Sequence, residues 1–187
     1  TVVPFMAAIE MIHTSSLVHD DLPCMDDDMM RRGKASTWAE YGEDMGVLAG
    51  DALMIYAFEV AAKAFNEVSE ADDLKRVGRA IEILAAKTGI YGMIGGQVVD
   101  VQSSGHAIDQ DRLDFIYELK TGALLEAAMM VGAVLAGASE EEVSVIEKVA
   151  SDVGIAFQIR DDILDVTSTL EELGKPIHSD DKNEKTT

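Results

Sequence analysis

Cysteine, proline and aromatic residues are all scarce in this 187-residue chain, which has one Cys, three Pro and 5% aromatic side chains. The single cysteine, Cys24, excludes an internal disulfide and favours a reducing, cytoplasmic setting. The shortage of prolines and aromatics, with 48% hydrophobic residues overall, favours helices over sheet. Because alternating strand patterns and short internal repeats are also lacking, we predict an all-α fold in a single domain over residues 1–187.

Basic residues are scarce as well, because 15 Lys and Arg stand against 35 Asp and Glu, for a net charge of −20. Surfaces that bind nucleic acids need clustered Lys and Arg, so we expect no nucleic-acid partner. The longest uncharged stretch, residues 127–139, is about a third shorter than the roughly 20 residues of a membrane span, so we expect no stable membrane insertion. An anionic substrate fits this charge, since carboxylates recruit Mg²⁺ and the metal attracts phosphate.

Apolar residues recur at helical spacing through nearly the whole chain. The predicted helices cover, in chain order, residues 3–22, 43–66, 69–88, 109–137 and 140–173. An irregular, charged connection is expected between the first two. Four glycines between positions 89 and 96 predict a close approach between helices, or between backbone and ligand.

The densest chemical signal is the stretch 20–28, which holds five aspartates in nine residues and precedes a basic run at 31–34. Asp20 and Asp21 fall in the last turn of the first predicted helix, because Pro23 cannot continue it. Negative charge at a helix C-terminus costs roughly 0.3 to 1 kcal/mol per acid unless a cation lies beside it. Two interpretations follow: a divalent-metal site, or a helix end neutralised by the basic run.

A second acidic group lies on the last predicted helix. At 100° per residue, Gln158, Asp161, Asp162 and Asp165 share an arc of about 100°. Like charges at this spacing repel on a bare helix, but they become ligands when Mg²⁺ is present. Either acidic group alone would be a solvated charge run. Together, on largely apolar helices, they predict two facing carboxylate plates that hold several Mg²⁺ ions and a diphosphate, for cleavage of an allylic C–O bond.

Several isolated polar residues leave two interpretations open. Asp51, among small residues, is either a capped polar group in the core or part of a site wall. Gln97 and Asp100, one helical turn apart, either line a pocket or make an internal hydrogen bond. Lys120, at the entry to an apolar half-helix, either faces an anion or reaches water. Glu126 is the one charge in that half-helix, which we expect to be buried.

The motifs, in this order, resemble those of the trans-prenyl diphosphate synthases, specifically the farnesyl and geranylgeranyl diphosphate synthases. The matching segments are 16–26, 31–34, 48–53, 95–97, 120–124, 157–165 and 174–176. The resemblance implies an all-α bundle around a deep central cavity, three Mg²⁺ ions, and condensation of isopentenyl diphosphate with an allylic diphosphate. It also implies a homodimer.

The same resemblance implies roles for individual residues. The implied metal ligands are Asp20 and Asp26 with Asp21 adjacent, and Asp161 supported by Asp162 and Asp165. The implied clamps of the allylic diphosphate are Arg31, Lys120 and Lys175, and Arg32 resembles a contact of isopentenyl diphosphate. Thr121 and Gln158 resemble the groups beside the developing cation, and Lys185 the basic residue of a closing loop.

In the family that the chain resembles, the residues four and five positions before the first aspartate set product length, and here they are Ser16 and Ser15. Ser16 lies one turn, about 5.4 Å, below Asp20. Two small side chains predict a deep cavity and a C20 product, with C15 as the alternative, so we expect Ser15→Phe to shorten the product. A Gly-Lys-Arg motif before the first helix and the helices after Thr187 have no counterpart in the chain, and we expect turnover to depend on them.

Three other interpretations compete with a synthase. A terpene cyclase would share the first aspartate motif and Mg²⁺, but usually has an Asn/Ser/Glu-type second site, unlike the acids at 161–165. A non-catalytic subunit of a heteromeric synthase would be expected to have lost metal ligands, and both sets are present. A purely structural acidic bundle leaves the joint presence of both plates and the basic motifs without an explanation.

Overall fold

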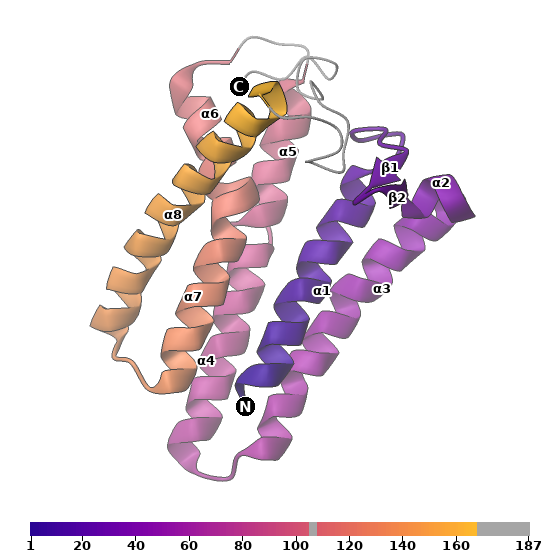
Figure 1. Cartoon of the computed structure of the whole chain (residues 1–187). Helices are drawn as coiled ribbons and strands as arrows, with labels where there is room; N and C mark the ends of the chain where they lie inside the picture. Colours follow the sequence, from indigo (N-terminus) through magenta and orange to yellow (C-terminus); the bar gives the residue numbers. More distant parts are fainter. Residues whose placement is uncertain (105–107, 168–187) are drawn as a thin grey trace.

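The computed structural model describes residues 1–104 and 108–167, which form a bundle of helices (Figure 1). The longer helices are α1 (Val2–Asp20), α3 (Glu43–Ala62), α4 (Ala71–Thr88), α5 (Met93–Ser103), α7 (Ala123–Ala136) and α8 (Glu140–Thr167). The shorter ones are α2 (Thr37–Tyr41), α6 (Gln110–Ile116), the 3-10 helix η1 (Lys63–Glu67) and the π-helix η2 (Tyr117–Gly122). Within these ranges the only strands, β1 (Met30–Arg31) and β2 (Lys34–Ala35), form a short hairpin, so the all-α prediction is confirmed.

Helices α1, α4, α5 and α8 run in one direction along the bundle, and α3 and α7 run in the other (Figure 1). The C-terminal ends of α1, α5 and α8 therefore gather at one end, together with the α6 and η2 segment that precedes α7 (Figure 1). Both predicted acidic groups, at the end of α1 and near the end of α8, are carried toward this end of the molecule.

Helix α3 packs along α1 through small residues. Its buried positions are Gly46, Gly50, Ala57 and Ala61. A Cβ atom at Gly46 would lie 2.8 Å from the Leu22 side chain, and one at Gly50 would overlap the imidazole ring of His19. A larger residue at either position would have to displace these side chains, so the two glycines allow the helices to approach this closely.

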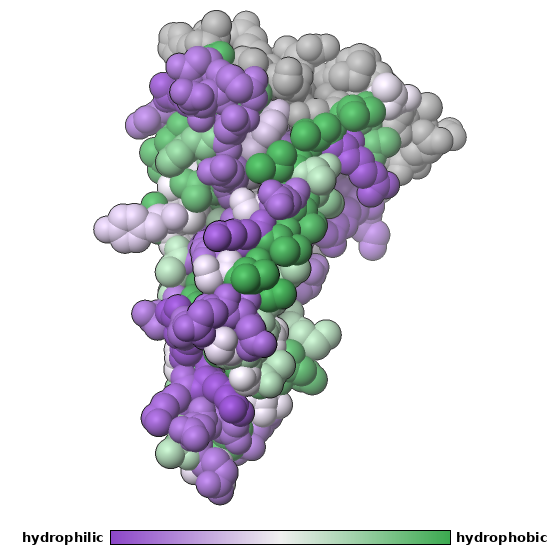
Figure 2. Space-filling model, turned by 90° about the vertical axis from the view of Figure 1, so that its left-hand side faces the viewer, coloured by the Kyte–Doolittle hydropathy of each residue, from purple (hydrophilic) through white to green (hydrophobic). Residues whose placement is uncertain are grey.

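The hydrophobic core joins α1, α3, α4, α5, α7 and α8. Its fully or almost fully buried members include Phe5, Ile12, Val77, Leu84 and Val131. Burying a side chain of this size contributes about 1.5 to 3 kcal/mol, which is how one continuous core holds the helices together. Helix α8 also exposes a stripe of apolar side chains, which includes Val145, Val149, Val153 and Phe157. Figure 2, which looks onto the side where α8 lies, shows a band of hydrophobic side chains.

Two predicted helices differ from the structure in their course. The helix expected over 109–137 is wrong as one α-helix, because the π-helix η2 separates α6 from α7. A Cβ atom at Gly96 on α5 would overlap the backbone of Leu119 and Lys120, so α5 presses directly against this interruption. The helix expected over 3–22 ends at Asp20, and the part of the last predicted helix beyond Thr167 lies outside the described residues.

The connection between α1 and α3 has more structure than the predicted irregular loop. The hairpin pairs Arg31 with Lys34, and its two turn residues, Arg32 and Gly33, both have positive φ (53° and 76°). This turn matches the right-handed twist of short hairpins, and glycine at its second position makes the conformation inexpensive. Sequence alternation could not predict the hairpin, because each strand has only two residues.

By length and composition alone, three helical stretches among the described residues would be long and apolar enough to cross a membrane: Val2–Asp20, Glu43–Glu67 and Gln110–Ala136. Each of these stretches contains a few charged residues, so none of them is the longest uncharged run of the sequence. In the structure, the first two pack against each other and the third is interrupted by η2. The absence of membrane insertion stays a prediction.

Candidate active site

The first aspartate, Asp20, is tied to α5. Its Oδ1 atom accepts a hydrogen bond of 2.8 Å from the Nε2 atom of Gln97. Gln97 therefore makes an internal hydrogen bond, which was one of its two predicted roles. The bond joins the end of α1 to the middle of α5 across 77 positions of sequence.

The second aspartate, Asp21, is almost fully buried and pairs with Arg31. The Nε and Nη2 atoms of Arg31 donate to Oδ1 of Asp21 at 2.9 and 2.5 Å, and Nη2 also donates to Asp28 at 3.2 Å. Burial raises the pKa of the Asp21 carboxyl, and Arg31 opposes that rise. At Arg31, burial lowers the pKa, but the hydrogen bond to Asp21 outweighs it, and the guanidinium stays charged. The interpretation of a helix end neutralised by a basic residue thus holds for Asp21.

The loop after α1 folds back on the helix end. The backbone N–H of Asp26 donates to the carbonyl of Asp20 at 2.9 Å, and that of Asp28 to the carbonyl of Asp21 at 3.1 Å. The indole Nε1 of Trp38 fixes the loop by donating to the Asp28 carbonyl at 2.9 Å. These bonds satisfy carbonyls that a helix C-terminus leaves without partners, and they return Asp26 to the neighbourhood of Asp20.

The π-helix η2 directs two adjacent side chains to two different helices. Lys120 donates from Nζ to Oδ2 of Asp100 on α5 at 2.6 Å, so it faces an anion. Thr121 donates from Oγ1 to Oε1 of Gln158 on α8 at 2.9 Å. A π turn holds more residues than an α turn and often occurs at functional sites. The structure therefore brings together three of the predicted catalytic residues with Asp100.

The approach of α8 to η2 depends on paired glycines. A Cβ atom at Gly154 would lie 2.8 Å from the Cα atom of Gly122, so a larger residue at 154 would force the backbones apart. Gln158 lies one turn beyond Gly154 on α8 and Thr121 directly precedes Gly122, which places the Thr121–Gln158 bond beside this contact.

The second acidic group is described only in part. Asp161 is half-buried on α8, and the side chains of Asp162 and Asp165 lie outside the described part. Lys175 and Lys185 lie outside the described residues. Within 1–104 and 108–167, no three acidic, histidine or cysteine side chains converge closely enough to share a metal ion.

The donor chemistry at the end of α1 still suits Mg²⁺. Asp20 and Asp26 offer hard carboxylate oxygens and are adjacent through their backbones, whereas Asp21 is committed to Arg31. Mg²⁺ is usually held by one or two carboxylates, with water and phosphate oxygens completing its six ligands. Two aspartates on this side are therefore enough to hold an ion together with a diphosphate.

The two serines predicted to set product length point in different directions. Ser15 is fully buried and donates a hydrogen bond of 2.9 Å to the carbonyl of Gly50 on α3. Ser16 donates to the His13 carbonyl within its own helix at 2.8 Å and lies on the face of Asp20, one turn below it. Ser16 is therefore the one of the two that lies beneath the aspartate.

Two other predicted residues are exposed. Asp51 is exposed on α3, and its Oδ1 atom lies 3.6 Å from Nε2 of His19, so its interpretation as a core polar group is wrong. Arg32 is exposed at the tip of the hairpin. The hairpin that carries it lies at the same end of the bundle as the C-terminal end of α1 (Figure 1).

Sequence reasoning missed the role of Lys87, at the end of α4. Its ammonium group pairs with Glu126 on α7 and Glu147 on α8. Glu126 is buried, as its apolar surroundings predicted. The one available signal was that a lone acid in an apolar half-helix needs a cation from another segment.

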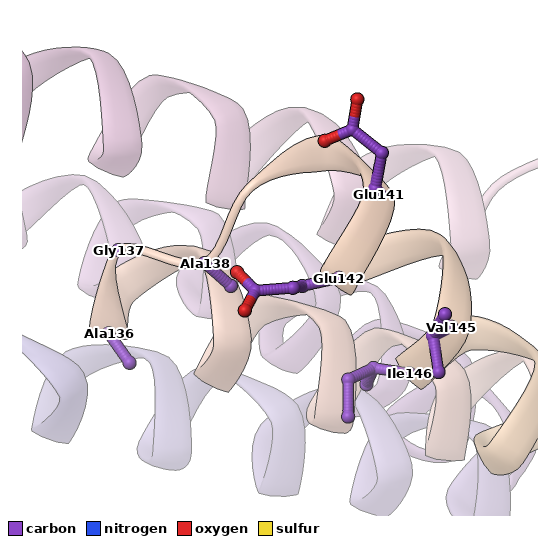
Figure 3. A pocket seen from close by; sticks show the side chains of 7 residues that line it. All are labelled: Ala136, Gly137, Ala138, Glu141, Glu142, Val145 and Ile146. Atoms are coloured by element: carbon purple, nitrogen blue, oxygen red, sulfur yellow. The ribbon is translucent and has the colours of Figure 1, made fainter.

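A hollow at the turn between α7 and α8 is separate from these residues (Figure 3). It is lined by Ala136, Gly137, Ala138, Glu141, Glu142, Val145 and Ile146. Glu142 accepts a hydrogen bond of 2.8 Å from the backbone N–H of Ser139, so this acid caps α8. None of the predicted site residues lines this hollow.

Comparison with known proteins finds similar chains among the prenyl diphosphate synthases. A chloroplastic geranylgeranyl pyrophosphate synthase of Catharanthus roseus is 48% identical over 178 residues, which are 95% of this chain and 49% of the relative. The farnesyl diphosphate synthase of Bacillus subtilis is 43% identical over 185 residues, 99% of this chain and 62% of the relative. The chain thus spans about half to three-fifths of these relatives.

The fold has close structural counterparts. The crystal structure of a geranyltransferase from Helicobacter pylori, complexed with magnesium and isoprenyl diphosphate, aligns with a TM-score of 0.86 at 39% identity. The alignment covers 94% of this chain and 56% of that structure. The model of the family described as polyprenyl synthetase matches residues 1–187. Together with the helical bundle and its aspartate motifs, this match shows that the chain belongs to the polyprenyl synthetase family.

Proposed function

We propose that the protein is a short-chain trans-prenyltransferase, which condenses isopentenyl diphosphate with an allylic diphosphate. The observation that carries the proposal is the double link through α5. Gln97 binds Asp20, and Asp100, one turn later, binds Lys120. One helix therefore connects a carboxylate suited to a metal with a cation suited to a phosphate, at the end of the bundle where Thr121 meets Gln158.

The proposed reaction breaks the C1–O bond of the allylic diphosphate, forms a C–C bond to the double bond of isopentenyl diphosphate, and releases a proton and diphosphate. Bound Mg²⁺, in three ions by family resemblance, would neutralise the leaving diphosphate. Asp20 and Asp26 would hold it on one side, and Asp161, with Asp162 and Asp165, on the other.

The chain's own cations and dipoles complete the proposed site. Lys120 would bind the diphosphate in exchange for, or together with, Asp100. The side-chain oxygens of Thr121 and Gln158 present partial negative charge, which favours a nearby allylic cation. Arg31, Arg32, Lys175 and Lys185 are assigned to the two diphosphates by motif.

We propose a C20 product, geranylgeranyl diphosphate, with C15 as the alternative. Support comes from Ser16, a small side chain one turn below Asp20, and from the names of the plant relatives. The similarity to a bacterial farnesyl diphosphate synthase supports C15 as the alternative product. Met93, which lies one turn before Gln97 on α5 and is buried, is the side chain that would limit the tail if the product is C15.

We also propose a homodimer in a cytoplasmic setting. Large apolar side chains are exposed on α3, including Leu48 (57%) and Ile55 (73%), on the side away from the α1 contact. An exposed apolar face of this kind marks an interaction surface. Light scattering on the purified full-length protein measures the assembly, and a monomer at micromolar concentration would overturn this part.

The decisive experiment is a product assay on the full-length protein with Mg²⁺, labelled isopentenyl diphosphate, and dimethylallyl, geranyl or farnesyl diphosphate as primer. We expect Mg²⁺-dependent elongation to C20, and its loss in Asp20→Asn. Asp27→Asn, an exposed neighbour, is the matched control. A C15 product would support the condensation reaction and indicate that another residue closes the bottom of the tail cavity. A cyclic hydrocarbon indicates a cyclase, and diphosphate binding without elongation indicates a non-catalytic subunit.

A further inference from the structure

Three charged side chains meet inside the bundle, away from the proposed diphosphate site. The Nζ atom of Lys87 on α4 contacts Glu126 on α7 and lies 2.6 Å from Oε1 of Glu147 on α8. The side chains of Lys87 and Glu126 are 22% and 11% exposed, and that of Glu147 is 39% exposed. We call these three residues the Lys87 network.

The Lys87 network lies on the same helix faces as the catalytic pairs. On α7, Glu126 is one turn beyond Gly122. On α8, Glu147 is two turns before Gly154, and Gln158 is one turn after it. The close contact of Gly122 with Gly154 therefore stands between the Thr121–Gln158 bond on one side and the network on the other.

The Lys87 network is also coupled to α5. Only six residues separate Lys87 from Ile94. The intervening turn is tight, because the N–H groups of Gly92 and Ile94 both donate to the Gly89 carbonyl, at 3.1 and 3.2 Å. A Cβ atom at Gly92 would overlap the carbonyl of Lys87. The place of Lys87 therefore fixes where α5 begins, and α5 carries Gln97 and Asp100.

We propose that Lys87, Glu126 and Glu147 are positioning residues for the transferase reaction. By clamping the end of α4 to α7 and α8, they set the register of α5 against η2 and α8. That register holds the Lys120–Asp100 and Thr121–Gln158 bonds in place. This inference rests on the proposed function.

The charges of the Lys87 network indicate that its main role is to fix the relative positions of the helices and not to stabilise the fold. Two carboxylates share one ammonium, and a buried ion pair is often no more stabilising than apolar side chains of the same volume. Directional hydrogen bonds from one Nζ atom to carboxylates on two helices, however, allow only a narrow range of relative positions. A merely apolar junction would let the helices slide.

The test replaces Lys87 with Met, which keeps the volume and removes the charge. We expect kcat to fall roughly tenfold to a hundredfold, the range that a small misplacement of catalytic groups produces, with KM for both substrates nearly unchanged. Lys87→Arg, which can still bind both acids, should recover most of kcat. Lys75→Met is the matched control, because Lys75 lies on the same helix but pairs only with exposed Asp72.

Hydrogen exchange gives a readout that does not require activity. In Lys87→Met, amides of 93–100, 117–122 and 154–158 should exchange faster, while those of 5–18 in α1 should not change. Glu147→Gln, at a half-exposed position, serves if Lys87→Met does not fold, with the same pattern expected.

Two results would overturn the inference. One is unchanged exchange at 117–122. The other is a loss of kcat that only follows the folded fraction and is not restored in Lys87→Arg. If the wild-type protein shows no elongation, the proposed transferase function fails first, and the exchange pattern alone decides whether the network sets the register.

Discussion

Gln97 on α5 donates a hydrogen bond of 2.8 Å to Asp20 at the end of α1. The bond fixes the orientation of the Asp20 carboxylate, and its donor, the Gln97 amide, is neutral. A neutral donor adds no positive charge beside the oxygens that would hold Mg²⁺. Gln97 is thus a positioning residue for the proposed metal ligand.

Replacing Gln97 with Leu should lower kcat/KM roughly tenfold to a hundredfold, because a hydrogen bond to a charged group contributes about 1.5 to 3 kcal/mol. The measurement is the elongation rate across Mg²⁺ concentrations. Gln110→Leu is the control, since Gln110 donates to Asp114 on an exposed part of α6. Equal rates in wild type and Gln97→Leu would contradict the assignment.

Replacing Asp21 with Asn should destabilise the fold by about 3 kcal/mol, because it leaves the partly buried Arg31 with Asp28 as its remaining acidic partner. Mg²⁺ affinity should change less than in Asp20→Asn. Denaturant unfolding and calorimetric Mg²⁺ titration measure the two effects. An affinity loss as large as that of Asp20→Asn would show that Asp21 is a direct ligand.

Bulky substitutions should separate the two serines. Ser16→Phe should shorten the product, because Ser16 lies beneath Asp20. Ser15→Phe should instead lower the free energy of unfolding by about 1 to 3 kcal/mol, because Ser15 is fully buried against α3. Met93→Ala should lengthen the product. Chromatography of the products checks all three, and a shortened product from a stable Ser15→Phe would reinstate the first prediction.

The Lys87 network should make stability depend on alkaline pH. Burial lowers the pKa of Lys87, but the hydrogen bonds that Lys87 donates to Glu126 and Glu147 outweigh it, so the pKa is raised above its ordinary 10.5. A raised pKa in the folded state stabilises the protein below about 10.5, and this stabilisation is lost as pH rises through the folded-state value. Unfolding free energy should therefore fall more steeply above pH 10.5 in wild type than in Lys87→Met. Parallel curves would contradict the raised pKa.

Periodicity and motif order were sufficient for the fold class and the family. The pattern of α4 predicted its C-terminal end at Thr88, because an amphipathic helix with an acidic first turn and a glycine after its last turn carries both boundaries in its own residues. The burial of Glu126 followed in the same way from its apolar neighbours. Such features depend on local spacing, which the sequence contains.

Only the tertiary structure decided which partner each polar group takes. Lys120 faces Asp100, Ser15 faces Gly50, and Lys87 joins Glu126 to Glu147 over distances in sequence of 20 to 60 positions. The break at η2 likewise arises where α5 and α8 press on it, which helical spacing alone does not encode. The sequence by itself determined which residues have the chemistry of the site; the packing of helices determined which of them meet, because side-chain pairing depends on the register between helices.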